Sequence, residues 1–208
     1  MTPGLGQRRS EGTILQAKPS DPGHNPRYTG YQNLEGRPPM LEQTTSRGRA
    51  HRRALPQREG KTVVVSEYLE IETTAAPGFH DITDEINAIV AESGVSFGHV
   101  TIFSKHTTAA IRINENEPLL LRDMCRTLRQ IAPSNAYYEH NDFSRRTVNM
   151  NPDECANGHA HCQNLFLATS ETIPVINGRT ALGTYQSVFV VELDHPRERE
   201  ILITVVGC

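Results

Sequence analysis

Apolar residues follow the two-residue period of β-strands along much of the chain beyond residue 61. Residues 62–71 open with the β-branched run Val63-Val64-Val65 and then alternate in polarity, which predicts a strand. The same reasoning, together with enrichment in β-branched residues, predicts further strands elsewhere in the chain. These are expected at 95–103, 109–113, 173–176, 181–193 and 200–206.

Two stretches instead repeat their apolar residues at intervals of three and four, the spacing of one helix face. The first begins near residue 86, directly after the capping candidates Asp81 and Thr83. The second covers 119–131 and has a proline in its first turn, where a helix tolerates it. A third helix is predicted over 159–168.

The order of these elements predicts one α+β domain over 62–208, built on packed antiparallel sheets with a few helices. Strands stand on each side of the helices, and Asn177-Gly178 is a typical hairpin turn. The polar segment 137–157 is too long for a simple connection. Long loops in compact domains are often functional, so this segment is a candidate for part of a site.

The first 61 residues differ in composition from the rest of the chain. They contain 11 Lys or Arg against 5 Asp or Glu, whereas the remainder contains 10 against 19. They also hold 7 of the 13 prolines and 8 of the 15 glycines, and they lack a sustained apolar period. We therefore predict a disordered basic tail over 1–61. Its basic run is interpreted as solvated, and no nucleic-acid partner is expected because the body is acidic.

Nothing in the sequence predicts contact with a membrane. No stretch approaches the ~20 apolar residues of a membrane-spanning helix, and the start lacks the features of a secretory signal. An intracellular protein with reduced cysteines is expected, and an organelle transit peptide stays open as an alternative. A metal site that combines Cys155 and Cys162 with the histidines between them is a less favoured possibility.

Histidines and carboxylates gather in short polar clusters where chemistry is expected. His106 follows a predicted strand, so its ring either faces a cleft or is an ordinary surface histidine. Glu115 lies where a strand hands over to a helix, and it either caps that helix or acts as a general base. His140 and His161 are ligands of the class that zinc prefers, although their spacing matches no zinc motif. His159 points about 200 degrees away from His161 on a helix, so both cannot bind one ion there.

Several motifs occur together in a fixed order along the chain. They are His106-Thr107-Thr108-Ala109-Ala110, Asn114-Glu115-Asn116, Tyr138-Glu139-His140, His161, Thr172-Ile173-Pro174-Val175, Asn177-Gly178-Arg179, Leu182-Gly183-Thr184-Tyr185-Gln186 and Glu192. Together they resemble the YjbQ-like family over residues 62–208. The resemblance implies an α+β fold, a homotrimer, a cytoplasmic location and a secondary thiamine-phosphate synthase activity.

Site residues follow from the resemblance by position. His106, Glu115, His140 and His161 match the family's histidines and carboxylate, and Gln186 matches the glutamine of its Gly-Thr-Trp-Gln motif. Tyr185 departs from the family's tryptophan, which keeps an aromatic ring but exchanges an indole donor for a hydroxyl. Glu192 matches an acidic position at the end of the same predicted strand.

The functional hypothesis is an enzyme that joins hydroxymethylpyrimidine diphosphate to a thiazole phosphate and releases pyrophosphate. His140 and His161 would hold a divalent metal, zinc or magnesium, with His106 or Glu192 as a third ligand. His106 and Glu115 would transfer or orient a proton, and Gln186 would line the same cleft. The alternatives are a metal or small-ligand binding protein without synthase turnover, and a metal-dependent hydrolase.

Overall fold

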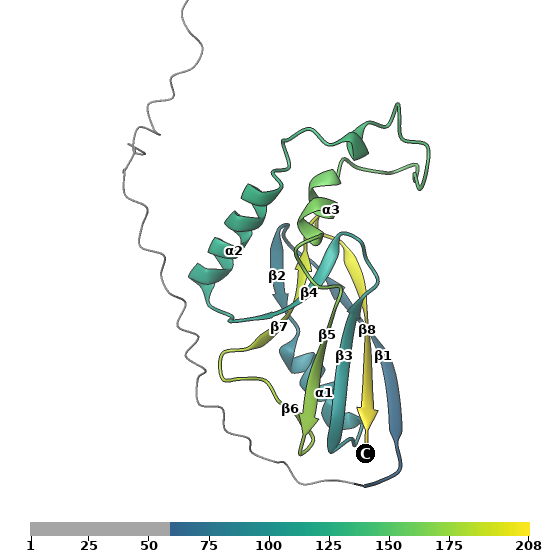
Figure 1. Ribbon diagram of the computed structural model, residues 1–208, viewed down its shortest axis with the longest axis vertical. Helices are drawn as coiled ribbons and strands as arrows, with labels where there is room; N and C mark the ends of the chain where they lie inside the picture. The colour runs from purple at the N-terminus through teal and green to yellow at the C-terminus, as the bar shows by residue number, and fades with distance from the viewer. Residues whose placement is uncertain (1–58) are drawn as a thin grey trace, which may run out of the picture. The chain divides into compact units, whose positions relative to one another are not determined.

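The computed structural model describes residues 59–208, which form two antiparallel sheets and three α-helices. The larger sheet has five strands in the order β1-β8-β3-β5-β6 (Figure 1). Every neighbouring pair in it is antiparallel. Its strands are β1 (Val63–Glu72), β8 (Glu198–Gly207), β3 (Phe97–Ser104), β5 (Ser170–Ile176) and β6 (Arg179–Thr180).

The smaller sheet has three antiparallel strands in the order β2-β7-β4. Its central strand is buried along nearly its whole length, because the sheet packs on both of its faces. The strands are β2 (Gly78–Asp81), β7 (Ser187–Glu192) and β4 (Ala109–Asn114). Except for the hairpin β5-β6, consecutive strands belong to different sheets; β3 and β4, for example, are joined by only four residues.

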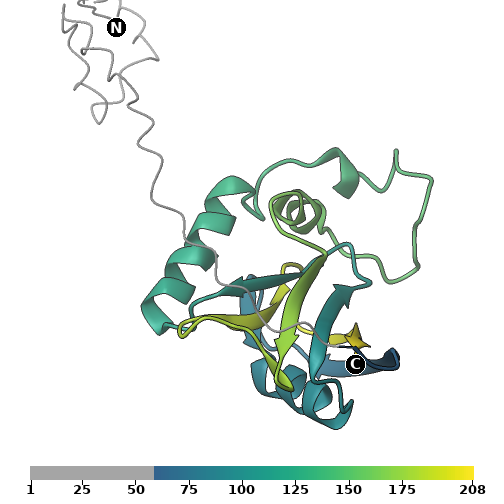
Figure 2. The ribbon, with the colours of Figure 1, turned by 60° about the horizontal axis from the view of Figure 1, so that its bottom comes forward.

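Helix α1 (Thr83–Glu92) supplies the apolar side chains that the two sheets share as their main core. Ile86 and Val90 are fully buried on the face that the periodicity predicted. Asp81 accepts a hydrogen bond from the N–H of Thr83, so the predicted capping residue does contact the first turn. In Figure 2, α1 and α3 lie on opposite sides of the strands.

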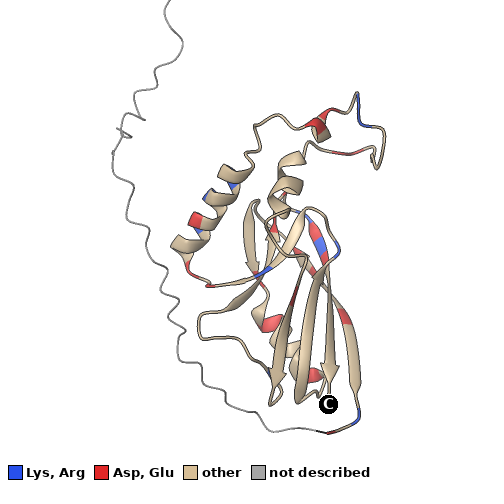
Figure 3. Ribbon diagram, in the orientation of Figure 1, with Lys and Arg blue, Asp and Glu red and all other residues tan. Residues whose placement is uncertain are grey.

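Helix α2 (Pro118–Ile131) and helix α3 (Gly158–Asn164) lie near the smaller sheet, with the one-turn helix η1 (Glu139–Asn141) between them in sequence. Leu128 of α2 is buried, and it joins a second apolar cluster around Phe189. The outer face of α2 carries charges of both signs (Figure 3). Its first turn is capped by Glu117, whose carboxylate accepts the N–H groups of Leu119 and Leu120.

The predicted α+β class with antiparallel sheets is confirmed, but the prediction of a strand over 181–193 is wrong in its first half. The strand β7 begins at Ser187, and residues before it form a turn in which the N–H of Gln186 donates to the carbonyl of Gly183. The strand β2 was not predicted, and α3 is shorter than the predicted helix over 159–168. The prediction of a disordered tail concerns residues that, up to residue 58, lie outside the described part.

Asn177 and Gly178 form the predicted turn between β5 and β6. Both have positive φ angles, 54° and 73°, which fits the paired left-handed residues of a tight hairpin turn. Among residues 59–208, no helix is long and apolar enough to cross a membrane.

Candidate functional site

Two connections cross from one sheet to the other at the same end of the molecule, and they create the candidate site. Residues 105–108 lead from β3 to β4, and residues 193–197 lead from β7 to β8. The register places Ala109 opposite Glu192 in the smaller sheet, so both crossings start or end at one level. Loop side chains at this end are therefore held by paired strands on both sides.

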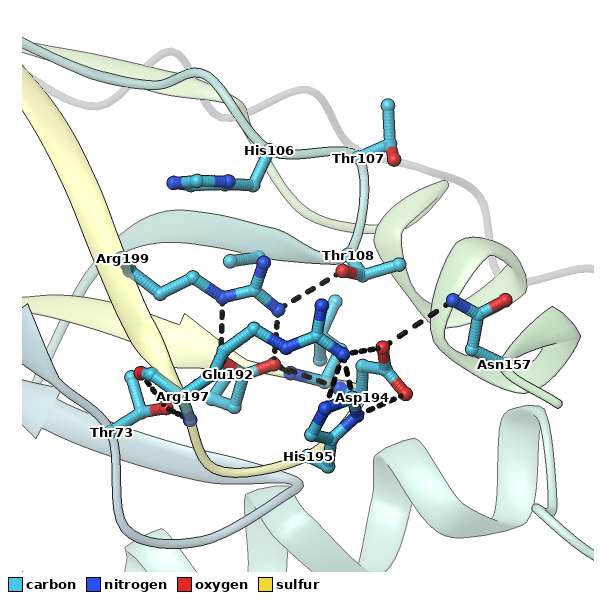
Figure 4. A network of polar contacts seen from close by, with 12 residues as sticks. Thr73, His106, Thr107, Thr108, Asn157, Glu192, Asp194, His195, Arg197 and Arg199 are labelled. Atoms are coloured by element: carbon cyan, nitrogen blue, oxygen red, sulfur yellow. Dashed lines mark hydrogen bonds and ion pairs between the residues drawn. The ribbon is translucent and has the colours of Figure 1, made fainter. Parts of the chain in front are cut away.

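A buried ion pair joins the two crossings. Arg199 donates from Nε to Oε2 of Glu192 at 2.7 Å and from Nη2 to Oε1 at 2.6 Å. Its Nη2 also donates to the hydroxyl of Thr108, and Thr73 donates to the same carboxylate (Figure 4). Burial alone would raise the pKa of Glu192, but the hydrogen bonds from Arg199 and from the N–H of Asp194 outweigh it and lower that pKa.

Glu192 is thus a structural anion and not an open ligand. Its side chain is fully buried, and both of its oxygens accept hydrogen bonds. A metal ion would have to displace Arg199 to reach it, so Glu192 does not serve as the third metal ligand in this arrangement.

His106 lines the cavity, which favours the cleft over the surface alternative. Its Nε2 lies 3.0 Å from the backbone nitrogen and 3.1 Å from the carbonyl oxygen of Glu200, so it accepts from the one or donates to the other according to the tautomer. Burial, and then the neighbouring charge of Arg199, lower the pKa of His106, so the ring is neutral at pH 7. Since the backbone of Glu200 occupies Nε2 in either tautomer, Nδ1 is the ring atom that His106 can offer to a ligand.

The long segment 137–157 contributes a second wall. Arg146 forms an ion pair with Glu154 at 2.8 Å, and both side chains are mostly buried. Arg146 also donates to the carbonyl of Asn149, and Glu154 accepts the N–H of Asn151. These bonds fix the segment internally, which supports the prediction that it is part of a site and not a plain connection.

These walls border a cavity of about 910 Å³ that is open to solvent. Four basic side chains, four histidines, one cysteine and several small polar groups line it. The charged or ionisable lining residues are Lys105, Arg146, Arg197, Arg199, His106, His140, His161, His195, Asp153, Glu154 and Cys155.

The charges around this cavity are arranged with cations inward. Lys105, Arg197 and Arg199 line the space, whereas the carboxylates that pair with them, on Glu200, Asp194 and Glu192, do not. The Nη1 of Arg199 forms no hydrogen bond with another described residue. The lining therefore presents mainly guanidinium, ammonium and imidazole groups to an anion. Its carboxylates are those of Asp153 and Glu154.

His140 and His161 lie together, as the metal hypothesis requires, with ring centroids 4.6 Å apart and planes at 65°. Nε2 of His140 is buried without a hydrogen-bond partner. Burial, and then the proximity of His140, lower the pKa of His161, so it is in its neutral form at pH 7. Within the described chain, however, no third His, Cys, Asp or Glu joins this pair within 4.8 Å, so the pair alone is a poor fit for a resident divalent metal.

Glu115 and Gln186 lie elsewhere in the chain. Asn114 pairs with Ser187 at the end of β4 and β7 opposite to Glu192, five strand steps or about 17 Å from the cavity level, and Glu115 and Gln186 each lie one residue beyond that pair. Both are exposed, and neither lines the cavity. Within one chain, therefore, Glu115 cannot form a proton-transfer pair with His106, and Gln186 does not line that cleft. Its carboxamide instead accepts the N–H of Gly183.

The sequence reasoning missed the contribution of the turn before β8. Asp194, His195, Arg197 and Arg199 come from one short charged run, and three of them line the cavity. With Glu198, five ionisable residues within six positions between two apolar strands were a signal that could have been used. Lys105 and Arg146 also lie in the lining.

The fold and the cavity define the chain as a small α+β protein with a histidine- and arginine-lined site between two sheets. Residues 67–208 match the family described as UPF0047 protein YjbQ-like, and the chain belongs to that family. A UPF0047 protein of Methanothermobacter thermautotrophicus is 38% identical over 144 residues, which cover 69% of this chain and 93% of the relative. YugU of Bacillus subtilis is 35% identical, with 67% and 97% covered.

Solved structures agree with the fold. A crystal structure from Sulfolobus solfataricus, described as a YbjQ-like protein of unknown function, is similar with a TM-score of 0.64 and 32% identity, covering 71% of this chain and all of the other. A hypothetical protein from Aeropyrum pernix gives 0.61 and 29%, with 69% and 99% covered.

Proposed function

We propose that this chain is an enzyme of the thiamine-phosphate synthase type, which joins hydroxymethylpyrimidine diphosphate to a thiazole phosphate and releases pyrophosphate. The observation that supports the proposal is the inward arrangement of cations around the cavity. Arg197, Arg199 and Lys105 line it while their carboxylates lie outside the lining. Departure of pyrophosphate needs charge stabilisation more than a strong nucleophile, and guanidinium groups supply it.

The chain's own residues would divide this work. Arg199 is held rigidly by Glu192 and offers Nη1, and Arg197 adds a second guanidinium at the same wall. His106 offers Nδ1 of a neutral ring, as donor or acceptor according to its tautomer, because Nε2 is occupied by the backbone of Glu200. His161 is neutral as well, so it can accept a proton or donate to a phosphate oxygen without adding charge. The cavity volume of about 910 Å³ lies in the range of small-molecule sites.

The test is thiamine phosphate formation by the full chain from the two substrates, with Arg197→Gln as the variant. Arg126→Gln is the matched control, because Arg126 lies on α2, is largely exposed and does not line the cavity. Loss of one charged hydrogen bond of roughly 1.5–3 kcal/mol should lower kcat/KM by about tenfold to a hundredfold in Arg197→Gln. No product from the folded wild type would contradict the synthase proposal.

Release of pyrophosphate from the pyrimidine diphosphate without the thiazole would instead favour the hydrolase alternative. Binding of the diphosphate without turnover would favour the small-ligand binding protein. The cytoplasmic location implied by the resemblance stays a prediction, which imaging of the full chain would test.

We also propose that the chain assembles as a homotrimer. Large apolar side chains are exposed in the single chain: Leu165 at 81%, Phe166 at 64% and Leu119 at 60%. Contiguous exposed apolar groups mark interaction sites, and Leu165 and Phe166 are neighbours in the chain. Light scattering should give three times the chain mass, and Phe166→Asp should reduce it. A monomeric mass for the wild type would contradict this proposal.

A further inference from the structure

Three side chains of different chemistry converge at the cavity wall beside Arg197. Sγ of Cys155 lies 3.7 Å from Oδ1 of Asp194 and 3.6 Å from Nδ1 of His195. Nδ1 of His195 lies 3.1 Å from the same Oδ1. Cys155 comes from the long segment before α3 and the other two come from the turn after β7, so the fold brings them together over about forty residues of sequence.

The three distances fit the edges of a tetrahedral zinc site. Zinc binds sulfur at about 2.3 Å and nitrogen or oxygen at about 2.0–2.2 Å, so tetrahedral angles place a sulfur about 3.5 Å from its fellow ligands. The same geometry separates a nitrogen from an oxygen by about 3.3 Å. The observed values of 3.6, 3.7 and 3.1 Å are each within a few tenths of an ångström of these edges.

The carboxylate of Asp194 is already oriented for such a role. Its side chain is 3% exposed, and its other oxygen, Oδ2, accepts hydrogen bonds from Arg197 at 2.5 Å and from Asn157 at 3.4 Å (Figure 4). Outer partners that hold one oxygen and leave the second free are a common feature of metal sites. Cys155 and His195 line the cavity, so the fourth position of the tetrahedron opens toward it.

We propose that Cys155, Asp194 and His195 bind one zinc ion whose fourth position faces the cavity. A thiolate with an imidazole selects zinc over magnesium, which prefers oxygen ligands. Three protein ligands with an open fourth position are the arrangement of catalytic zinc. The site differs from the His140 and His161 pair, and it stands independently of the synthase proposal.

Arg197 is the competitor for this site. Its Nη2 lies 2.5 Å from Nδ1 and 2.6 Å from Nε2 of His195, on the side where the ion would bind. Arg197 is about a third exposed, so its guanidinium can move off the ring while it keeps its bond to Oδ2 of Asp194 when the ion binds.

The experiment is a competition titration of zinc against a chromophoric chelator, with the reduced, metal-free full chain. Cys155→Ser and His195→Ala should each weaken binding by more than roughly 100-fold, beyond the loss from an outer partner. Cys162→Ser is the matched control, since Cys162 is a second free thiol and does not line the cavity. It should bind like the wild type.

The absorption spectrum of bound cobalt is a second measurement, which would not change if Cys155 had only a structural role. Cobalt bound by the wild type should show the charge-transfer absorption of a thiolate ligand, and Cys155→Ser should lose this band while Cys162→Ser keeps it. Binding of less than one zinc per chain would overturn the proposal. Loss of zinc in His161→Ala with retention in Cys155→Ser would also overturn it, because the ion would then lie at the histidine pair.

Discussion

The Glu192–Arg199 ion pair permits the sharpest prediction of stability, through the substitution Glu192→Gln. The two side chains are 0% and 4% exposed, and the carboxylate accepts two hydrogen bonds from the guanidinium. The amide retains the shape but removes the negative charge, so Arg199 stays buried without its counter-ion. Loss of one partner of a buried pair costs about 3–5 kcal/mol. For a domain of this size that corresponds to a fall in Tm of roughly 6 to 20 °C.

Urea unfolding followed by circular dichroism measures this free energy. The matched control is Glu171→Gln, because Glu171 pairs with Arg112 at 3.5 Å between partly exposed side chains. Such a pair contributes about 0–1 kcal/mol, so the control should unfold close to the wild type. A Glu192→Gln protein within 1 kcal/mol of the wild type would refute the reasoning that this pair holds the two crossings together.

The same pair sets a dependence on pH. The folded pKa of Glu192 is lowered below its ordinary value of 4.5. Its contribution is therefore fully present above pH 4.5 and is lost as the pH falls through the folded pKa. Glu192→Gln should flatten the acid limb of a plot of unfolding free energy against pH, and an unchanged slope would contradict this assignment.

Two further predictions concern the helix cap and the histidine pair. Glu117→Ala should lower the unfolding free energy by about 0.5–2 kcal/mol in urea titration because Glu117 caps α2, whereas Glu115→Ala should leave it nearly unchanged; equal effects would contradict the cap. The pKa of His161 is lowered from 6.5, so the folded state favours the neutral ring. Its contribution to the unfolding free energy is therefore fully present above pH 6.5 and decreases as the pH falls below that value. His161→Gln should reduce that fall in melts between pH 5 and 7, and an unchanged profile would remove His161 as its source.

Local patterns were sufficient to predict the fold class and most of its elements. The helical spacing of Ile86 and Val90 is a local signal that burial reinforces, whereas the β-branched run at Val63 predicts its strand although Val63 and Val64 are exposed. The strand predicted over 181–186 was wrong because turn hydrogen bonds at Gly183 outweighed an apparent alternation. The assignment of strands to two different sheets depends on contacts distant in sequence, so periodicity could not predict it.

The sequence motifs located cavity residues only where the motif lies at the cavity end of the strands. Three histidines line the cavity: His106 from the connection after β3, His140 from η1 and His161 from α3. Glu115 and Gln186 come from motifs of equal strength, but strand length places them at the other end of the sheet. His106 precedes and Glu115 follows the same predicted strand, so the length of that strand, which the motifs do not take into account, separates the two residues.

The most direct test of the cavity as a diphosphate site is an isothermal titration of pyrophosphate into chelator-treated wild-type protein, Arg197→Gln and Arg126→Gln. Chelation removes bound metal, so the titration isolates the effect of the guanidinium groups. We expect one binding site per chain, affinity lower by about tenfold to a hundredfold in Arg197→Gln, and no change in Arg126→Gln. Absence of binding, or equal loss in both variants, would contradict the account.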